Sequence, residues 1–183
     1  MRILIDLNKP ETIEAAKQAL EDYKKWIRTC VDTLVSMMMD TGTDNAGRMY
    51  GSALYAGNND TQVGYDVERK GDTVTGRIYA YGTAVLFIEF GTGITKGDNP
   101  QERAEASGGN LVPHGWYGRG NGANLNGWFL SSSGSGNMPP DTDVIDGNKV
   151  HTFGNDANSC LYLTREDLIR DFESMARTVF SGD

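Results

Sequence analysis

The chain is poor in the residues that most metal and redox sites require. It has two cysteines and two histidines among 183 residues. Cys30 and Cys160 lie far apart and show no metal-ligand spacing, so we expect two reduced, packed thiols, with a disulfide as the alternative. Neither His114 nor His151 lies near a Cys, Asp or Glu at ligand spacing, which argues against a metal centre or histidine-based catalysis.

Long apolar runs and an excess of positive charge are also missing. No segment approaches the ~20 apolar residues of a membrane span, and Met1-Arg2-Ile3-Leu4-Ile5-Asp6 is not the start of a signal peptide. Lys and Arg number 17 against 25 Asp and Glu, a net charge of -8, which argues against a general nucleic-acid binder. We expect a soluble protein made in the cytoplasm, or one that lines a passage for DNA.

Glycine, by contrast, is abundant. There are 23 glycines, while hydrophobic residues make up 38% of the chain. This composition fits a single domain, residues 1–183, with a modest core and long irregular segments. Fourteen of the glycines lie between residues 91 and 154, where apolar periodicity is absent. We interpret residues 92–153 as a glycine-rich insert, an extended loop that carries function or awaits a partner.

Helices and one hairpin are predicted around this insert. After a short strand at residues 2–7, Pro10 suits the first turn of a helix, and apolar residues keep helical spacing to about residue 39. We expect residues 40–44 to end this helix and to cap a shorter one at residues 46–54. Residues 62–68 and 73–80 alternate as two strands around Lys70-Gly71-Asp72. Thr164 is the predicted start of an amphipathic helix that ends near residue 181.

The predicted fold class is therefore α+β, a small antiparallel sheet flanked by a long N-terminal helix and a C-terminal helix. The apolar face of the N-terminal helix would be ~40 Å long. Because a small core cannot cover that length, we expect part of this face to contact another subunit. Its apolar residues are Ile13, Ala16, Leu20, Tyr23, Ile27, Cys30, Leu34 and Met37.

The most apolar stretch, residues 84–93, encloses a single carboxylate. It reads as a buried strand or as one buried helical turn, and periodicity does not decide between them. Glu89 needs a fixed partner, because an unpaired carboxylate in an apolar segment is costly. We favour a structural carboxylate bound to backbone N–H groups over one half of a catalytic pair. The following Gly91-Thr92-Gly93 could turn back and supply those groups.

Other candidate sites are weak. Asp141, Asp143 and Asp146 lack the regular spacing of a calcium loop, and residues 118–122 lack the strand, helix and lysine of a phosphate-binding loop. The three methionines at residues 37–39 are interpreted as core or interface filler. Four aromatic residues of the insert are predicted to contact a neighbouring protein rather than sugars or bases: Trp116, Tyr117, Trp128 and Phe129. No catalytic, cofactor-binding or metal-binding residue is predicted, and no enzyme activity.

One segment resembles a known family. Glu89-Phe90-Gly91-Thr92-Gly93 ends the apolar stretch, Tyr55-Ala56-Gly57-Asn58-Asn59-Asp60 precedes the hairpin, and Gly154-Asn155-Asp156-Ala157-Asn158 precedes the last helix. With the order of the elements, these motifs look like the head–tail joining, or tail-completion, minor tail proteins of long-tailed phages and prophages. The long insert places the chain with an insert-bearing subgroup, since the usual short form lacks it.

The resemblance implies a structural virion protein without catalysis or cofactor. It implies a homo-oligomeric ring at the neck, between the portal or connector and the tail tube, through which DNA passes without sequence-specific binding. In that setting Glu89, Phe90, Gly91, Thr92 and Gly93 are the structural and assembly residues. Two alternatives stay open: a tail terminator ring that caps the tube, and a glycan-binding tail component that uses the aromatic residues of the insert.

Overall fold

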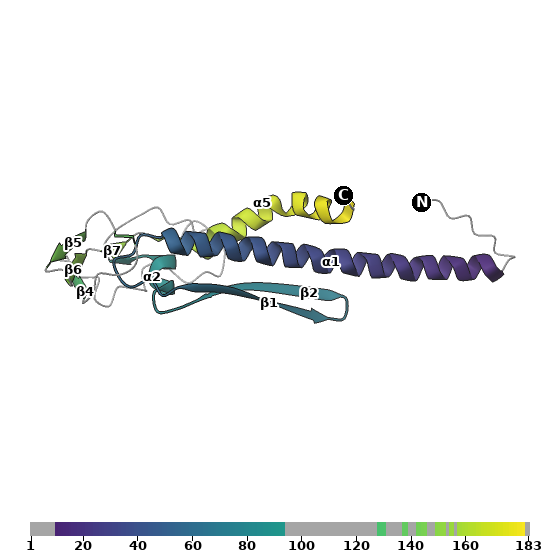
Figure 1. Ribbon diagram of the computed structural model, residues 1–183, viewed down its shortest axis with the longest axis horizontal. Helices are drawn as coiled ribbons and strands as arrows, with labels where there is room; N and C mark the ends of the chain where they lie inside the picture. The colour runs from purple at the N-terminus through teal and green to yellow at the C-terminus, as the bar shows by residue number, and fades with distance from the viewer. Residues whose placement is uncertain are drawn as a thin grey trace, which may run out of the picture.

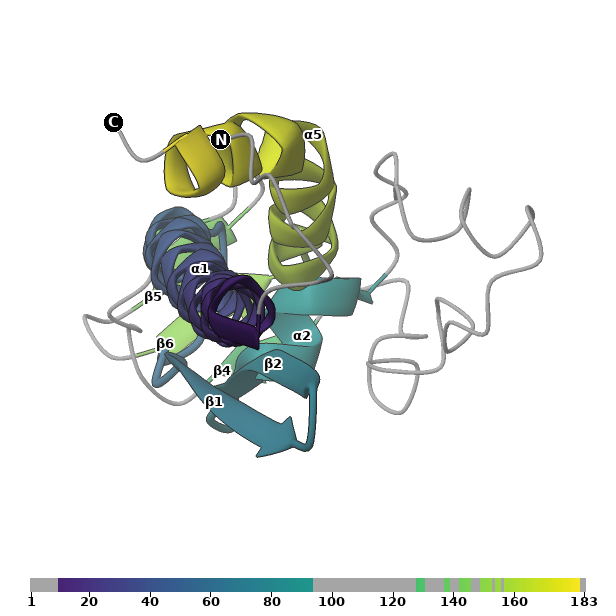
Figure 2. The same cartoon turned by 90° about the vertical axis from the view of Figure 1, so that its right-hand side faces the viewer.

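One long helix forms the axis of the molecule. The computed structural model describes residues 10–93, 128–130, 137–138, 142–145, 149–152, 154–155 and 157–181, so the strand predicted at residues 2–7 lies outside the described residues. Helix α1 spans Pro10–Ser52. The hairpin of β1 (Gln62–Lys70) and β2 (Thr73–Tyr81) lies along one side, and α5 (Cys160–Ser181) lies on the other (Figures 1 and 2). The predicted α+β class is confirmed.

The predicted break in the first helix is wrong. Residues 40–44 continue α1 without interruption, although they contain a glycine and polar residues that often end helices. Gly42 is buried at a close approach: a Cβ there would lie 2.3 Å from Cδ1 of Ile78 on β2 and 2.9 Å from Cδ1 of Leu168 on α5. The glycine therefore lets both neighbours pack against α1, and this packing outweighs its low helix propensity.

The predicted hairpin is confirmed in position. β1 pairs antiparallel with β2, and Lys70 lies opposite Thr73 across the turn. Gly71 has a φ of 60°, a left-handed conformation that glycine adopts without a steric penalty. Along β2, partly buried and exposed residues alternate through all nine positions. This alternation is the pattern expected for a sheet with one face on the helix.

Short elements connect the hairpin to the rest of the chain. Helix α2 covers Val85–Phe90 and is followed by β3, Thr92–Gly93, which pairs antiparallel with β7, Gly154–Asn155. A separate three-stranded sheet has the order β4-β6-β5, with β4 at Trp128–Leu130, β5 at Thr142–Ile145 and β6 at Lys149–Thr152. Each of these strands is too short to show a convincing alternation in sequence, and none was predicted.

The C-terminal helix begins four residues earlier than predicted. It starts at Cys160 rather than at Thr164, which is buried within it. Ser159, directly before Cys160, is a residue type that favours helix starts, but residues 160–163 are too few and too uniformly apolar to show a helical pattern, so the earlier start was not predicted. Both Cys30 and Cys160 are free and buried, as expected for packed, reduced thiols.

The core lies where α1, α2 and α5 meet. Ile88 and Cys160 are 0% exposed and Tyr50 is 1% exposed. These residues form one cluster with Ala53, Ala84 and Val85. The cluster lies at the C-terminal end of α1, so the N-terminal part of α1 is far from it (Figure 1). Within the described part of the chain, no helix combines the length and the apolar character needed to cross a membrane.

Candidate functional site

The apolar stretch around Glu89 folds as a short helix that ends at a glycine. Val85, Ile88 and Glu89 are the buried residues of α2. Gly91 follows with a φ of 74°, where a side chain would be strained, and the chain then enters β3. The two possibilities left open by the sequence are thus resolved, since residues 85–90 are helical and residues 92–93 are extended.

The carboxylate of Glu89 binds two other helices. Tyr50 on α1 donates its hydroxyl to Oε2 at 2.8 Å. The backbone N–H groups of Leu161 and Tyr162, in the first turn of α5, donate to Oε2 at 3.1 Å and to Oε1 at 3.3 Å. These N–H groups are among those that a helix leaves without an internal partner, and the positive end of the helix dipole favours a carboxylate beside them.

Glu89 therefore caps α5 from a distance of more than seventy residues along the chain. Its expected role as a carboxylate bound to backbone N–H groups matches this geometry. The groups found here belong to the start of α5 rather than to the Gly91-Thr92-Gly93 segment that we expected to turn back. With 5% of its surface exposed, Glu89 leaves little room for a substrate, and the arrangement is suited to holding helices together.

Backbone hydrogen bonds reinforce this junction. The N–H of Asn158 donates to the carbonyl of Ile88 at 2.9 Å, and the N–H of Ser159 donates to the carbonyl of Glu89 at 3.1 Å. Ser159 has a φ of 48°, an uncommon value for a residue other than glycine. The end of α2 and the start of α5 are thus joined by main chain as well as by the Glu89 carboxylate.

The environment of Glu89 keeps two neighbouring groups protonated. Burial raises the pKa of the Tyr50 phenol, and the nearby Glu89 carboxylate raises it further. Burial, followed by the charge of Glu89, raises the pKa of the Cys160 thiol to about 12. A neutral phenol can donate to the carboxylate, and a neutral thiol packs in the core as a small apolar group.

Asp60, the last residue of the motif that precedes the hairpin, is a second organising carboxylate. Its Oδ2 accepts hydrogen bonds from the backbone N–H and the hydroxyl of Thr83, both at 2.9 Å, and its Oδ1 accepts one from the N–H of Ala84 at 3.0 Å. These bonds, first among them those from the backbone, hold the pKa of Asp60 below its ordinary value. The sequence signal for this role was an acidic side chain at the end of Gly57-Asn58-Asn59-Asp60. Its partner Thr83 lies 23 residues later, so the contact itself was not predicted.

The two ends of the predicted insert lie side by side. Thr92 pairs with Asn155 and Gly93 pairs with Gly154, so the chain leaves the body and returns to it at one place. A further attachment lies at the end of α1, where the N–H of Tyr55 donates to the carbonyl of Asn137 at 2.8 Å. The insert is therefore fixed to the body at its base and at one internal point.

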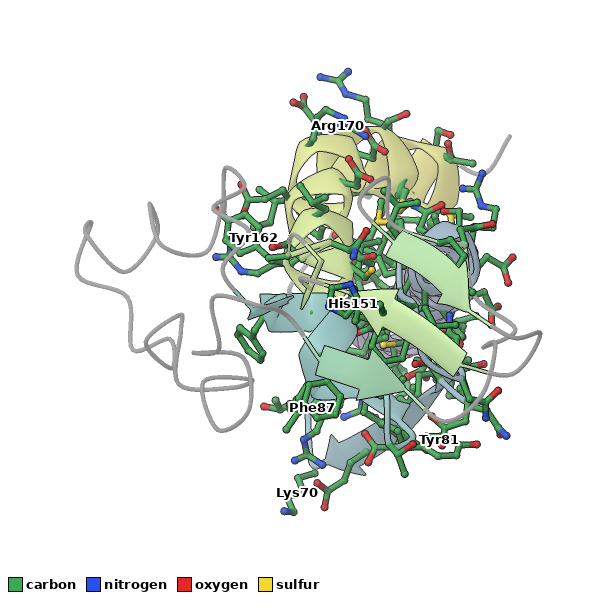
Figure 3. All side chains as sticks on the ribbon, turned by 90° about the vertical axis from the view of Figure 1, so that its left-hand side faces the viewer. Lys70, Tyr81, Phe87, His151, Tyr162 and Arg170 are labelled. Atoms are coloured by element: carbon green, nitrogen blue, oxygen red, sulfur yellow. The ribbon has the colours of Figure 1, made fainter. Side chains whose placement is uncertain are left out.

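The predicted aromatic contact residues fall into two groups. Trp116 and Tyr117 lie outside the described residues. Trp128 and Phe129 are in β4, where they pair with Thr152 and His151 of β6. Figure 3 views the molecule from the end where this sheet lies, with His151 on its middle strand and Phe87 on α2. Of the four residues, the structure describes Trp128 and Phe129, so it does not test whether all four form one surface.

The weaker candidates are accounted for where the structure describes them. Met39 is 7% exposed and its sulfur lies beside Gly76 of β2, so it fills the core as expected. His114, Asp141, Asp146 and residues 118–122 lie outside the described residues. Among the residues that the structure describes, no group of three or more His, Cys, Asp or Glu side chains is arranged to hold a metal ion.

Comparison with known proteins identified no match. No protein-family model, no curated protein and no solved structure matches this chain. The functional interpretation therefore depends on the motif around Glu89, on its geometry and on the surfaces of the molecule.

Proposed function

We propose that the chain is a structural subunit of a phage neck, which joins the head to the tail as a tail-completion or head–tail joining protein. Its partners are other copies of itself in a ring, the connector or head-completion proteins on one side, and the tail tube or terminator on the other. DNA passes through the channel without sequence-specific contacts. The location is the virion, after assembly in the host cytoplasm, and the role needs neither catalysis nor a cofactor.

The observation that carries this proposal is the place of Glu89-Phe90-Gly91-Thr92-Gly93 in the fold. Glu89 caps α5 and binds Tyr50 of α1, while Thr92 and Gly93 form the base of the insert. The motif that supports the resemblance therefore joins the helical body to the segment that distinguishes this chain from the short form. A long insert whose two ends are held together at one base suits a subunit that must contact a neighbour in an assembly.

A second observation supports assembly in general. Leu20 is 52% exposed and Tyr23 is 58% exposed on the N-terminal part of α1, so this helix presents apolar side chains away from the described body. Large exposed apolar side chains that follow one another on a helix are typical of an interaction surface. The net charge of -8 is compatible with a channel that DNA crosses without adhering.

The test is to locate the protein in phage particles. A phage that carries an epitope tag on this chain is purified and labelled with gold-conjugated antibody, and untagged particles serve as the control. We expect label at the head–tail junction. Label at the tail tip would favour the glycan-binding alternative, and tagged particles that assemble without label would contradict the proposal.

Inactivation of the gene separates the two neck roles. Without a head–tail joining protein, filled heads and tails of normal length accumulate unjoined. Without a terminator, the tube lacks its cap and continues to polymerise, so overlong tails accumulate. Electron microscopy of the lysate distinguishes these outcomes, and normal infectious particles would exclude both.

A further inference from the structure

The N-terminal part of α1 extends beyond the described elements that pack against its remaining length, the hairpin and α5. We call residues 10–25 the arm. Just after it, the ring of Trp26 meets that of Phe180 near the end of α5, with centroids 5.9 Å apart, and Arg28 binds Asp72 at the hairpin turn at 2.9 Å. Both neighbours of α1 thus end at the base of the arm, which projects past them (Figure 1). At 1.5 Å per residue the arm is ~24 Å long.

An apolar groove lies on the part of the molecule away from the arm. It is formed by α1, β2 and α5 and has a volume of about 530 Å³. Its lining includes Met38, Met39, Ile78 and Leu168. Ile169 and Phe172 also line it, with 56% and 47% of their surfaces exposed. Methionine adapts its shape to an incoming side chain, so this lining suits a helix surface.

The arm cannot fill the groove of its own copy. Leu20 and Met38 belong to one uninterrupted helix, and eighteen residues along a helix span ~27 Å. A bend sharp enough to bring the arm back would need a break in α1, and α1 has none. Because each copy carries one arm and one separate groove, copies can pair either reciprocally, as a two-fold dimer, or head to tail, and head-to-tail contacts close into rings when the rotation per copy divides a full turn.

The exposed area is sufficient to begin such a contact. Leu20, Tyr23, Ile169 and Phe172 each expose about half of their surface, on the order of 100 Å² per side chain. Together they offer ~400 Å² of apolar surface, against the ~1,200 Å² that a small specific interface buries in total. The remainder would have to come from residues around these four, on the arm and at the rim of the groove.

We infer that the arm of one copy packs into the groove of the next copy. The inference rests on the proposed function, because it names the surfaces through which copies of the chain form the ring. It assigns Leu20 and Tyr23 to one side of the contact, and Ile169 and Phe172 to the other.

Paired variants of the full chain test this contact. The arm variant carries Leu20→Glu with Tyr23→Glu, and the groove variant carries Ile169→Glu with Phe172→Glu. The control, Tyr79→Glu with Tyr81→Glu, adds the same charge at hairpin residues that are 46% and 52% exposed. Circular dichroism checks that helix content is retained. In sedimentation velocity we expect oligomers for the wild type and the control, and 20.0 kDa monomers for the arm and groove variants.

Mixing the two monomeric variants gives the decisive result. The groove variant keeps an intact arm and the arm variant keeps an intact groove, so an equal mixture should form a 1:1 dimer and stop there. An arm-to-arm contact would give no such dimer. The absence of the heterodimer, or a wild type that stays monomeric up to about 1 mM, would overturn the inference.

This outcome is independent of the phage experiment. Gold label at the neck with no heterodimer would refute the arm–groove contact and leave the proposed function in place. A heterodimer with no label at the neck would establish the contact and refute the neck role.

Discussion

At the scale of single residues, the main feature is a buried carboxylate on α2 whose partners come from two other helices, α1 and α5. Tyr50 is 39 residues before Glu89, and Leu161 is 72 residues after it. The sequence predicted that Glu89 needs fixed hydrogen-bond donors, because an apolar segment offers none of its own. The sequence did not predict which groups donate to Glu89, since neither Tyr50 nor the start of α5 carries a local signal for that contact.

Replacing Glu89 with Ala should be strongly destabilising. The change leaves the buried hydroxyl of Tyr50 and two backbone N–H groups of α5 without this acceptor, and we expect a loss of about 3 kcal/mol or more in the free energy of unfolding. Urea unfolding followed by circular dichroism measures it. The control is Glu166→Ala, an exposed acid on α5 that pairs with Arg165, which should change stability by less than about 1 kcal/mol. Equal effects in the two variants would contradict the capping role.

The lowered pKa of Asp60 predicts that the stability of the protein depends on pH. Its pKa in the folded protein lies below the ordinary value of 3.8, so its contribution is present above that value and is lost as the pH falls through the folded pKa. Asp60→Ala should therefore lower the urea midpoint at neutral pH, and the difference from wild type should shrink as the pH is lowered below about 3.8. Urea titrations across this range measure it. A difference that stays constant with pH would show that the charge of Asp60 is not the cause.

At the scale of elements, the regular spacing of apolar residues predicted which helices and strands form, but not where the helices begin and end. The hairpin strands and the apolar face of α5 follow period-2 and period-3.6 spacing, and the structure contains both elements. The wrong predictions concern where helices start and stop. Gly42 seemed to end α1 because its low propensity is visible in the sequence, whereas the packing of Ile78 and Leu168 over it is not. Cys160 begins α5 because Glu89 supplies a cap from another element.

Gly42 provides a test of this packing argument. Gly42→Ala places a Cβ 2.3 Å from Ile78 and 2.9 Å from Leu168, so we expect a loss of about 1–3 kcal/mol despite the better helix propensity of alanine. Gly47→Ala in the same helix is the control, because a Cβ there meets nothing within 4 Å. That control should stabilise the protein by up to about 1 kcal/mol. Thermal or urea unfolding decides, and stabilisation by both changes would show that Gly42 is not a packing glycine.

At the scale of the whole molecule, charge and apolar surface make opposite contributions to association. Each copy has a net charge of -8, which opposes the approach of another copy, while the arm and the groove are apolar. Association should therefore strengthen as salt rises from about 50 mM to about 500 mM, because screening weakens the repulsion between copies. Sedimentation velocity at the two salt concentrations measures this trend. Weaker association at high salt would indicate an interface held by ion pairs instead.

The assignment of residues 1–183 to one domain, with an insert at residues 92–153, remains a prediction. Glycine content was the basis for setting this segment apart from the body, but it gave no indication of β4, β5 and β6. It also did not reveal that Gly93 and Gly154 pair at its base. Such pairing joins residues about sixty positions apart, which composition cannot detect.

The sequence by itself determined the α+β class, the hairpin with its turn at Gly71, the helical periodicity of both long helices and the need for Glu89 to be bound. These features follow from contacts between residues close in sequence, or from the cost of burying a charge. The tertiary structure alone decided that α1 continues through Gly42 and that Glu89 joins three helices. Each of these depends on atoms brought together from distant parts of the chain, and no local pattern encodes that proximity.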